Sequence, residues 1–316
     1  MNSVLITGGA GFLGSHLAER IINNEEYKNY NVIILDNLVR TNSLKNIEHL
    51  LSNPKLKFHH TDISTCNFED FVDPFTVLWV FHLAATRINR CNDKPLEGHK
   101  YIADGGVKLI DWVSKYNIKF FFASSASVYQ KPKELPIKES INCLPHTIYG
   151  SGKLYCENIL RSYHELFGLE YVINRFFSIY GIRMDSSGPY TEILWNFFNQ
   201  IKKGKKDIFL YGNPDEKVLD LVYVDDVVDA VLLTMKNSKN DIFNVSTQTG
   251  ITLTNLVDLM EEITDTKLNR IILNEERKDI ELKRIGDVSK LRKLGWEYKI
   301  SLKEGLEKTW QWIKNL

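Results

Sequence analysis

The stretch VLITGGAGFLGSHLAERI, residues 4–21, decides the fold class of this chain of 316 residues. A short apolar run leads into a turn with Gly8, Gly11 and Gly14, and a segment with helical apolar spacing follows. A strand, a glycine turn and a helix in this order are typical of a phosphate-binding βα unit. Gly8 permits the tight turn, Gly11 lets a pyrophosphate approach the backbone, and Gly14 lets helix and strand pack closely. The stretch therefore predicts a dinucleotide site.

The same alternation of short apolar runs with longer amphipathic stretches continues through the first two thirds of the chain. It predicts an α/β fold of the Rossmann type, a doubly wound parallel sheet with helices on both faces. The predicted strands are 3–7, 31–36, 57–61, 77–83, 119–124, 171–176 and 242–245. Helical spacing occurs at 14–23, 105–116 and 149–167.

A carboxylate closes the second predicted strand, as a site for adenosine ribose requires. Asp36 ends VIILD about 20 residues beyond the glycines, where it can accept from both ribose hydroxyls. It would repel a 2′-phosphate, so NAD is favoured over NADP, although Arg40 is close in sequence. Asp62, after the third strand, suits either the adenine amino group or a helix N-cap.

Serines end the fifth predicted strand, and Tyr149 and Lys153 lie one turn apart on the helix that follows. A phenol titrates near 10, so it is a poor base unless positive charge stabilises the phenolate. A charge about 4 Å away contributes on the order of 4 kcal/mol at an effective dielectric of about 20. We therefore predict that Lys153, together with an oxidised nicotinamide, brings the pKa of Tyr149 near neutral. Tyr149 is then the general base and Ser125 the donor to the substrate oxygen. The alternative is an incidental helix pair beside turn serines.

Composition excludes several classes of partner. Lysine plus arginine and aspartate plus glutamate both number 40, so no global field attracts nucleic acid or membrane. The four cysteines, at 66, 91, 143 and 156, show neither paired nor metal-ligand spacing. No apolar run reaches the roughly 20 residues that span a bilayer. We expect a cytoplasmic protein that has no metal site.

At this point the chain resembles a known family, the extended short-chain dehydrogenases grouped as NAD-dependent epimerases and dehydratases of nucleotide sugars. The resemblance covers nearly the whole chain. It rests on TGGAGFLGSHL at 7–17, DNL at 36–38, HLAA at 82–85, SSASVY at 124–129, YGSGK at 149–153, RFFSIYG at 175–181, GPY at 188–190, YVDD at 223–226 and DVSKLRKLGW at 287–296. It implies that Ser125, Tyr149 and Lys153 are the catalytic residues.

The cofactor and substrate residues follow from these motifs. For NAD we assign Gly8, Gly11, Phe12, Leu13, Gly14, Asp36, Asn37, Asp62, Ile63, Leu83, Ala84, Ala85, Tyr149 and Lys153. For a nucleotide-diphosphate sugar we assign Thr86, Arg87, Ser125, Ser178, Tyr190, Lys217 and Arg277. Arg90 is a weaker candidate, and a surface position is an equal alternative for Arg277.

Several positions depart from the family pattern. Its 4,6-dehydratases carry an Asp-Glu pair after the serine position, whereas this chain has Ala126 and Ser127. Neither side chain can act as a carboxyl acid or base, so dehydration is disfavoured. Ile102 and Ser178 replace asparagines of the family, and Leu219 lies at or beside a diphosphate-binding arginine. Lys217 would then replace that arginine.

Three functions remain open on the sequence. The first is a nucleotide-sugar 4-epimerase, in which a 4-keto intermediate turns over and hydride returns to its other face. The second is a dehydrogenase that oxidises C4 of a nucleotide-linked hexose or heptose and releases the 4-keto nucleotide sugar. The third is a non-catalytic NAD(H)-sensing protein, because a fold does not imply an activity.

Domain organisation and assembly complete the expectations. We predict an NAD-binding domain of residues 1–174 plus about 218–247, and a smaller α/β nucleotide-sugar-binding lobe of 175–217 and 248–316. The late helical stretches 253–263 and 302–313 have no strands to match. The resemblance implies a homodimer through the helices at 105–116 and 149–167, which carry Val107, Trp112, Tyr155 and Leu166.

Overall fold

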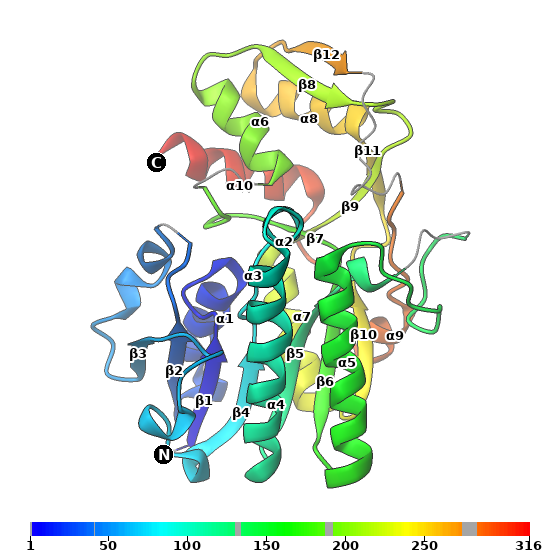
Figure 1. The fold of residues 1–316 in the computed structure, drawn as a ribbon. Helices are drawn as coiled ribbons and strands as arrows, with labels where there is room; N and C mark the ends of the chain where they lie inside the picture. The colour runs from blue at the N-terminus through cyan, green and yellow to red at the C-terminus, as the bar shows by residue number, and fades with distance from the viewer. Residues whose placement is uncertain (1, 41, 130–133, 187–191, 274–282) are drawn as a thin grey trace.

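The computed structural model describes residues 2–40, 42–129, 134–186, 192–273 and 283–316. Its centre is a parallel sheet with the strand order β10-β6-β5-β4-β1-β2-β3 (Figure 1). The strands are β1 Asn2–Thr7, β2 Tyr30–Asp36, β3 Leu56–His60, β4 Val77–His82, β5 Lys119–Ser125, β6 Tyr171–Phe176 and β10 Asp241–Val245. All of the predicted strands of this sheet are confirmed, with ends that differ by one residue at most. The strand order reverses between β1 and β4, where doubly wound sheets bind their ligands.

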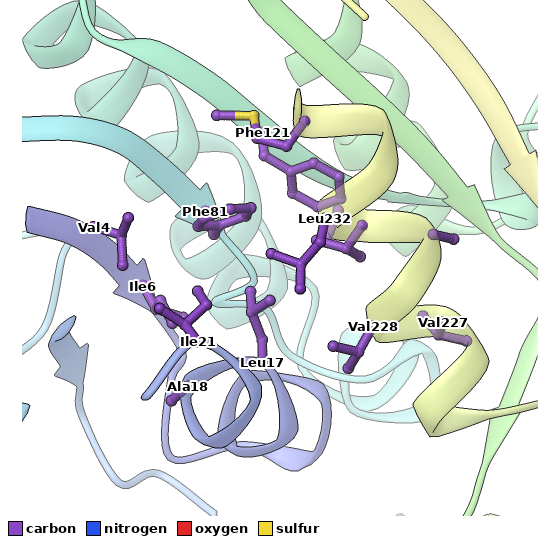
Figure 2. Close-up of a cluster of buried hydrophobic side chains, with 14 of the residues drawn as sticks. Val4, Ile6, Leu17, Ala18, Ile21, Phe81, Phe121, Val227, Val228 and Leu232 are labelled. Atoms are coloured by element: carbon purple, nitrogen blue, oxygen red, sulfur yellow. The ribbon is translucent and has the colours of Figure 1, made fainter. Parts of the chain in front are cut away.

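Helices cover both faces of this sheet. Helices α1 (Phe12–Asn23) and α7 (Val224–Asn237) pack on one face, and α4 (Gly105–Lys115) and α5 (Ile148–Phe167) pack on the other. Figure 2 shows the first of these layers, where side chains of α1 and α7 meet Phe81 and Phe121 of the sheet. Burial of these apolar faces fixes the sheet edge at which the polar motif residues emerge.

Helix α5 has well-defined ends, which matters because it carries Tyr149 and Lys153. The hydroxyl oxygen of Thr147 accepts from the N–H of Gly150 at 3.0 Å, so Thr147 is an N-cap. At the other end Gly168 has φ +74°, the left-handed conformation that closes many helices. The cap sets Tyr149 in the first turn of the helix.

A smaller lobe lies beyond the C-terminal edge of the large sheet (Figure 1). It contains helices α6 Ile193–Lys202, α8 Leu253–Thr264 and α10 Leu302–Lys314, which share one apolar core. Its strands are β7 Ser178–Tyr180, β8 Asp207–Tyr211, β9 Val218–Tyr223, β11 Gly250–Thr252 and β12 Asn269–Leu273. The two late helices are confirmed, but the expectation that no strands accompany them is wrong. Strand β11 directly precedes α8, and β12 pairs with β8 in parallel.

The remaining segments connect these layers. They include α2 Ile88–Asp93, α3 Pro95–His99, a π-helical turn at Lys100–Asp104 and α9 Ser289–Lys293. Near the C-terminus Val288, Leu291 and Trp296 pack into the core of the large sheet. Among the described residues, no helix combines the length and apolar content that crossing a bilayer requires.

Candidate active site

A cavity of about 850 Å³ lies at the C-terminal edge of the large sheet, between it and the smaller lobe. Nineteen of the residues that the sequence assigns to NAD or to the substrate line this cavity. They are Gly8, Gly11, Phe12, Leu13, Gly14, Asp36, Asn37, Asp62, Ile63, Leu83, Ala84, Ala85, Thr86, Arg87, Ser125, Tyr149, Lys153, Ser178 and Lys217. Tyr190 and Arg277 lie outside the described residues.

The glycine turn is as tight as its sequence predicts. Gly8 has φ +73°, and a Cβ there would lie 2.6 Å from the backbone nitrogen of Ala84, which follows the end of β4. A Cβ on Gly14 would lie 2.3 Å from the carbonyl oxygen of Gly8. Helix α1 therefore packs against the turn as closely as backbone atoms allow. At Gly11 a Cβ would meet Gly8 alone, at 3.1 Å, so the cavity side of the turn is open.

Asp36 ends β2 beside this turn, and backbone groups hold its carboxylate. Its two oxygens accept from the N–H groups of Ala10, at 3.0 Å, and Leu38, at 2.9 Å. Burial raises the pKa of Asp36, and these two hydrogen bonds oppose the rise. The carboxylate faces the cavity with a fixed orientation, as a ribose site requires.

Asp62 follows β3 and begins a turn rather than a helix. Its carboxylate accepts from the backbone N–H and the hydroxyl of Ser64, and its other oxygen lies 3.7 Å from the Nζ of Lys100. It also lines the cavity. The helix N-cap alternative is therefore wrong, while a contact with adenine stays a prediction.

Tyr149, Lys153 and Ser125 lie together on the cavity wall. The Nζ of Lys153 is 5.7 Å from the centre of the Tyr149 ring and donates to the carbonyl oxygen of Ala123 at 2.8 Å. Lys153 is almost fully buried, whereas Tyr149 is partly accessible from the cavity. The Oγ of Ser125 accepts from the backbone N–H of Ser127 at 3.1 Å.

Burial shifts the pKa values of both titratable groups. Burial raises the pKa of Tyr149 to about 12, although its hydrogen bond with Ser125 opposes the rise. Burial lowers the pKa of Lys153 to about 8. Lys153 keeps its ammonium beside the carbonyl oxygen of Ala123, on the same cavity wall as the phenol. The sequence-based prediction concerns Lys153 together with an oxidised nicotinamide, so a phenol with a pKa near neutral stays a prediction for the NAD-bound enzyme.

The substrate side of the cavity contains an ionic cluster that sequence reasoning did not find. The guanidinium of Arg87 pairs with Asp185, at 3.3 Å from Nε to Oδ2, and with Glu192. Arg40 lies 3.9 Å from the same oxygen of Asp185. Asp185 and Glu192 are about 100 residues from Arg87 in sequence, so no local pattern relates them.

Arg284 is a second residue that the sequence analysis missed. It lines the cavity, and its Nη1 donates to the Oγ of Ser127 at 3.4 Å. Arg90, by contrast, pairs with Glu97 and does not line the cavity, so the weaker expectation for it is wrong. Leu219 and Ser178 do line it, which places two of the atypical positions at the site.

Comparison with known proteins agrees with this geometry. The model of the GDP-mannose 4,6-dehydratase family matches residues 5–309. A putative UDP-glucose 4-epimerase from Methanocaldococcus jannaschii is 34% identical over 99% of this chain and 98% of its own.

Solved structures give the same result. A UDP-glucose 4-epimerase from Thermotoga maritima, determined with UDP-glucose, is 31% identical, covers 99% of both chains and has a TM-score of 0.89. A UDP-glucose 4-epimerase from Thermus thermophilus, determined with NAD, is 26% identical, covers 98% of both chains and has a TM-score of 0.85. The chain therefore belongs to the NAD-dependent epimerases and dehydratases of nucleotide sugars, enzymes of the short-chain dehydrogenase type.

Proposed function

We propose that this enzyme oxidises C4 of a nucleotide-diphosphate sugar and then reduces the 4-keto sugar from its other face, as an NAD-dependent 4-epimerase. One observation carries the proposal. The glycine turn, Asp36 and the three residues Ser125, Tyr149 and Lys153 line the same cavity.

The residues present fit NAD. The Gly11 side of the turn is a cradle that a Cβ would fill, and α1 begins at Phe12 with its N-terminus toward the cavity. A helix N-terminus stabilises phosphate charge. Asp36 would hold the adenosine ribose, and Arg40, which would otherwise suit a 2′-phosphate, is engaged with Asp185. When bound, NAD supplies the hydride acceptor and donor.

The protein groups handle the proton and the oxygen. Ser125 donates to the C4 oxygen as it becomes a carbonyl, and Tyr149 takes the hydroxyl proton and later returns it. Because burial raises the pKa of Tyr149 to about 12, the phenol stays protonated until further positive charge stabilises the phenolate. Lys153 holds its own charge against the carbonyl of Ala123 and orients the end of β5.

Dehydration does not fit the site, although the matching family model is named for a dehydratase. Ala126 and Ser127 follow Ser125, and both are buried. The carboxylates among the described lining residues have partners away from Ser125. Asp36 accepts from backbone N–H groups, Asp62 lies near Lys100, and Glu192 pairs with Arg87.

The substrate class follows from the relatives and the site. Because the relatives above are described as UDP-glucose 4-epimerases, we propose a UDP-linked hexose. Lys217, and Arg277 by family resemblance, are the proposed diphosphate ligands. The altered positions Ser178 and Leu219 at the cavity favour a dehydrogenase that releases the 4-keto sugar as the second candidate.

Incubation with a panel of nucleotide sugars separates these functions. Bound NADH is followed by its absorbance, and product stereochemistry by NMR. Inverted product without net NADH supports the epimerase. NADH that persists until a carbonyl compound is added selects the dehydrogenase, and no change with any sugar leaves only a binding protein.

Three further proposals concern the whole protein. We propose the domain division 1–174 plus about 218–247 against 175–217 and 248–316, with two shared segments: β9 pairs with strands of the smaller lobe, and residues 288–296 pack on the large sheet. The four cysteines are free in the structure, which supports a cytoplasmic location. Exposed apolar side chains on α5 support a homodimer.

A further inference from the structure

Helix α5 contacts the end of β5 at three successive turns. The side chains of Tyr149, Lys153 and Glu157 are spaced by four residues and therefore share one helix face. The Ser125 side chain lies close enough to Tyr149 to lower the pKa of the phenol. Lys153 donates to the carbonyl of Ala123 at 2.8 Å, and Glu157 accepts from the hydroxyl of Ser124 at 2.5 Å. Three consecutive residues of the strand are thus each tied to one turn of the helix.

Of these three side chains, Glu157 is also bound by a neighbouring strand. Its two carboxylate oxygens accept from the Nε of Arg175 at 3.0 Å and from its Nη2 at 2.6 Å. Glu157 is fully buried, and Arg175 is 1% exposed. In the sheet, Arg175 of β6 is paired directly with Ser124 of β5. The carboxylate therefore joins the helix to two neighbouring strands at one level.

Arg175 is itself held in place from its other side. Its guanidinium carbon lies 4.8 Å from the centre of the Tyr129 ring, and its Nη1 donates to the carbonyl of Glu139 at 3.1 Å. The Tyr129 hydroxyl donates to Asn244 on β10 at 2.6 Å. A fully partnered buried network of this kind fixes one arrangement of its members.

We propose that Glu157 is a positioning residue for catalysis, which holds the end of β5 in register with α5 so that Ser125 faces Tyr149 and Lys153 keeps its bond to Ala123. Glu157 does not line the cavity, so it acts through its neighbours. This inference rests on the proposed function, because the residues that it positions are the proposed catalytic ones.

The charge of Glu157 also bears on Lys153. Ionisable groups face that ammonium from three elements: His82 on β4, Cys91 on α2, and Tyr149, Cys156 and Glu157 on α5 itself. Burial lowers the pKa of Lys153, and the Glu157 carboxylate is among the groups that oppose the decrease. Removing that charge should make Lys153 lose its proton at lower pH.

Two variants test the proposal. Ser124→Ala removes the hydrogen bond between β5 and Glu157 but leaves the Arg175–Glu157 pair intact. Glu157→Gln removes the negative charge of the side chain. The matched control is Thr234→Val, because Thr234 accepts a buried hydrogen bond from Asn174 on β6, next to Arg175 but on the opposite face. Each protein is assayed for kcat and KM with the sugar that the wild type converts.

For Ser124→Ala we expect kcat to fall about ten-fold while KM changes by less than about two-fold, as loss of a charge-assisted hydrogen bond in a positioning network would give. The control should keep the kcat of the wild type although its unfolding midpoint falls. A kcat within about two-fold of the wild type in Ser124→Ala would overturn the proposal. A kcat that falls equally in the control would also overturn it, because the loss would then follow stability alone.

A second measurement needs neither cofactor nor substrate. The carbon resonance beside the Lys153 amine, in protein with labelled lysine, is assigned with Lys153→Arg and followed from pH 6 to pH 10. In Glu157→Gln the titration midpoint of Lys153 should move to lower pH. An unchanged or higher midpoint would contradict the claim that the Glu157 charge stabilises the Lys153 ammonium. Failure of the proposed function is distinct, since the wild type would then convert no nucleotide sugar.

Discussion

At the scale of single residues, the site depends on the phenol of Tyr149 and the ammonium of Lys153, and burial disfavours the charged form of each. The sequence correctly indicates that Tyr149 and Lys153 share a helix face and reach one cavity with Ser125. It could not indicate the balance between charge and burial, because burial depends on α2, β4 and β5, which lie far away in the chain. Burial therefore decides both pKa values.

Tyr149→Phe removes the proposed base but keeps the ring. We expect turnover to fall by about 10² to 10⁴, the usual contribution of a general base, while NAD affinity stays near that of the wild type. Steady-state kinetics and a fluorescence titration with NAD measure the two effects. Turnover close to the wild-type value would remove Tyr149 from the mechanism.

Lys153→Met should stabilise the protein near neutral pH while abolishing activity. The folded pKa of about 8 lies below the unfolded value of 10.5, so between these pH values the unfolded chain binds more protons. The stability of the wild type therefore rises with pH across this window, by up to about 3 kcal/mol. At pH 7 the variant should have the larger free energy of unfolding, by an amount that the lost bond to Ala123 reduces. This difference from the wild type should shrink by a similar amount from pH 7 to pH 10.

Urea unfolding at both pH values checks this expectation. An advantage of Lys153→Met that does not change with pH would show that the amine is not buried in its charged form at pH 7.

At the scale of elements, the regular part of the fold could be predicted and the irregular part could not. The parallel strands of the large sheet are buried on both faces, so they read as short apolar runs. Strands β8 and β12 form a two-stranded sheet with exposed positions, and β7 and β11 have three residues each. Such short strands leave too few residues for periodicity to show.

The glycine turn is the element whose sequence and function are most tightly linked. In Gly14→Ala the new Cβ would lie 2.3 Å from the carbonyl oxygen of Gly8 and 2.6 Å from the Cα of Gly9, so the backbone must shift. We expect a loss of about 1–3 kcal/mol in stability, typical of overpacking, and NAD affinity weaker by at least about ten-fold. Calorimetric titration with NAD measures the second effect.

Gly168→Ala is the control for this variant. Gly168 also has a left-handed backbone, with φ +74°, and it caps the far end of α5. A Cβ there would meet no atom within 4 Å beyond its two chain neighbours. The control variant should lose stability and keep NAD affinity. Equal NAD binding by Gly14→Ala and Gly168→Ala would contradict a phosphate site at the turn.

At the scale of the whole molecule, α5 presents apolar side chains to solvent. Ile148, Tyr155, Leu166 and Phe167 are between 40% and 73% exposed. Trp112 of α4, a residue of the expected interface, is instead 4% exposed and bonds Glu69. The helix pattern could not separate these cases, because α4 and α5 each have one face on the sheet.

We expect the wild type to sediment as a homodimer through this face. Tyr155→Asp combined with Leu166→Asp would place charge in the buried interface and give a monomer, which sedimentation velocity detects. Phe75→Asp, at a residue that is 88% exposed elsewhere on the surface, is the control and should leave the dimer intact. A monomeric wild type would refute the expectation.

Transfer of the C4 hydrogen tests the central claim most directly. The wild type is incubated with a UDP-hexose carrying deuterium at C4, and both the product and the bound cofactor are analysed by mass spectrometry and NMR. We predict the C4 epimer with its deuterium retained, and a transient deuterium on the cofactor. Deuterium released to water, or a cofactor that never acquires it, would contradict oxidation at C4 in this cavity.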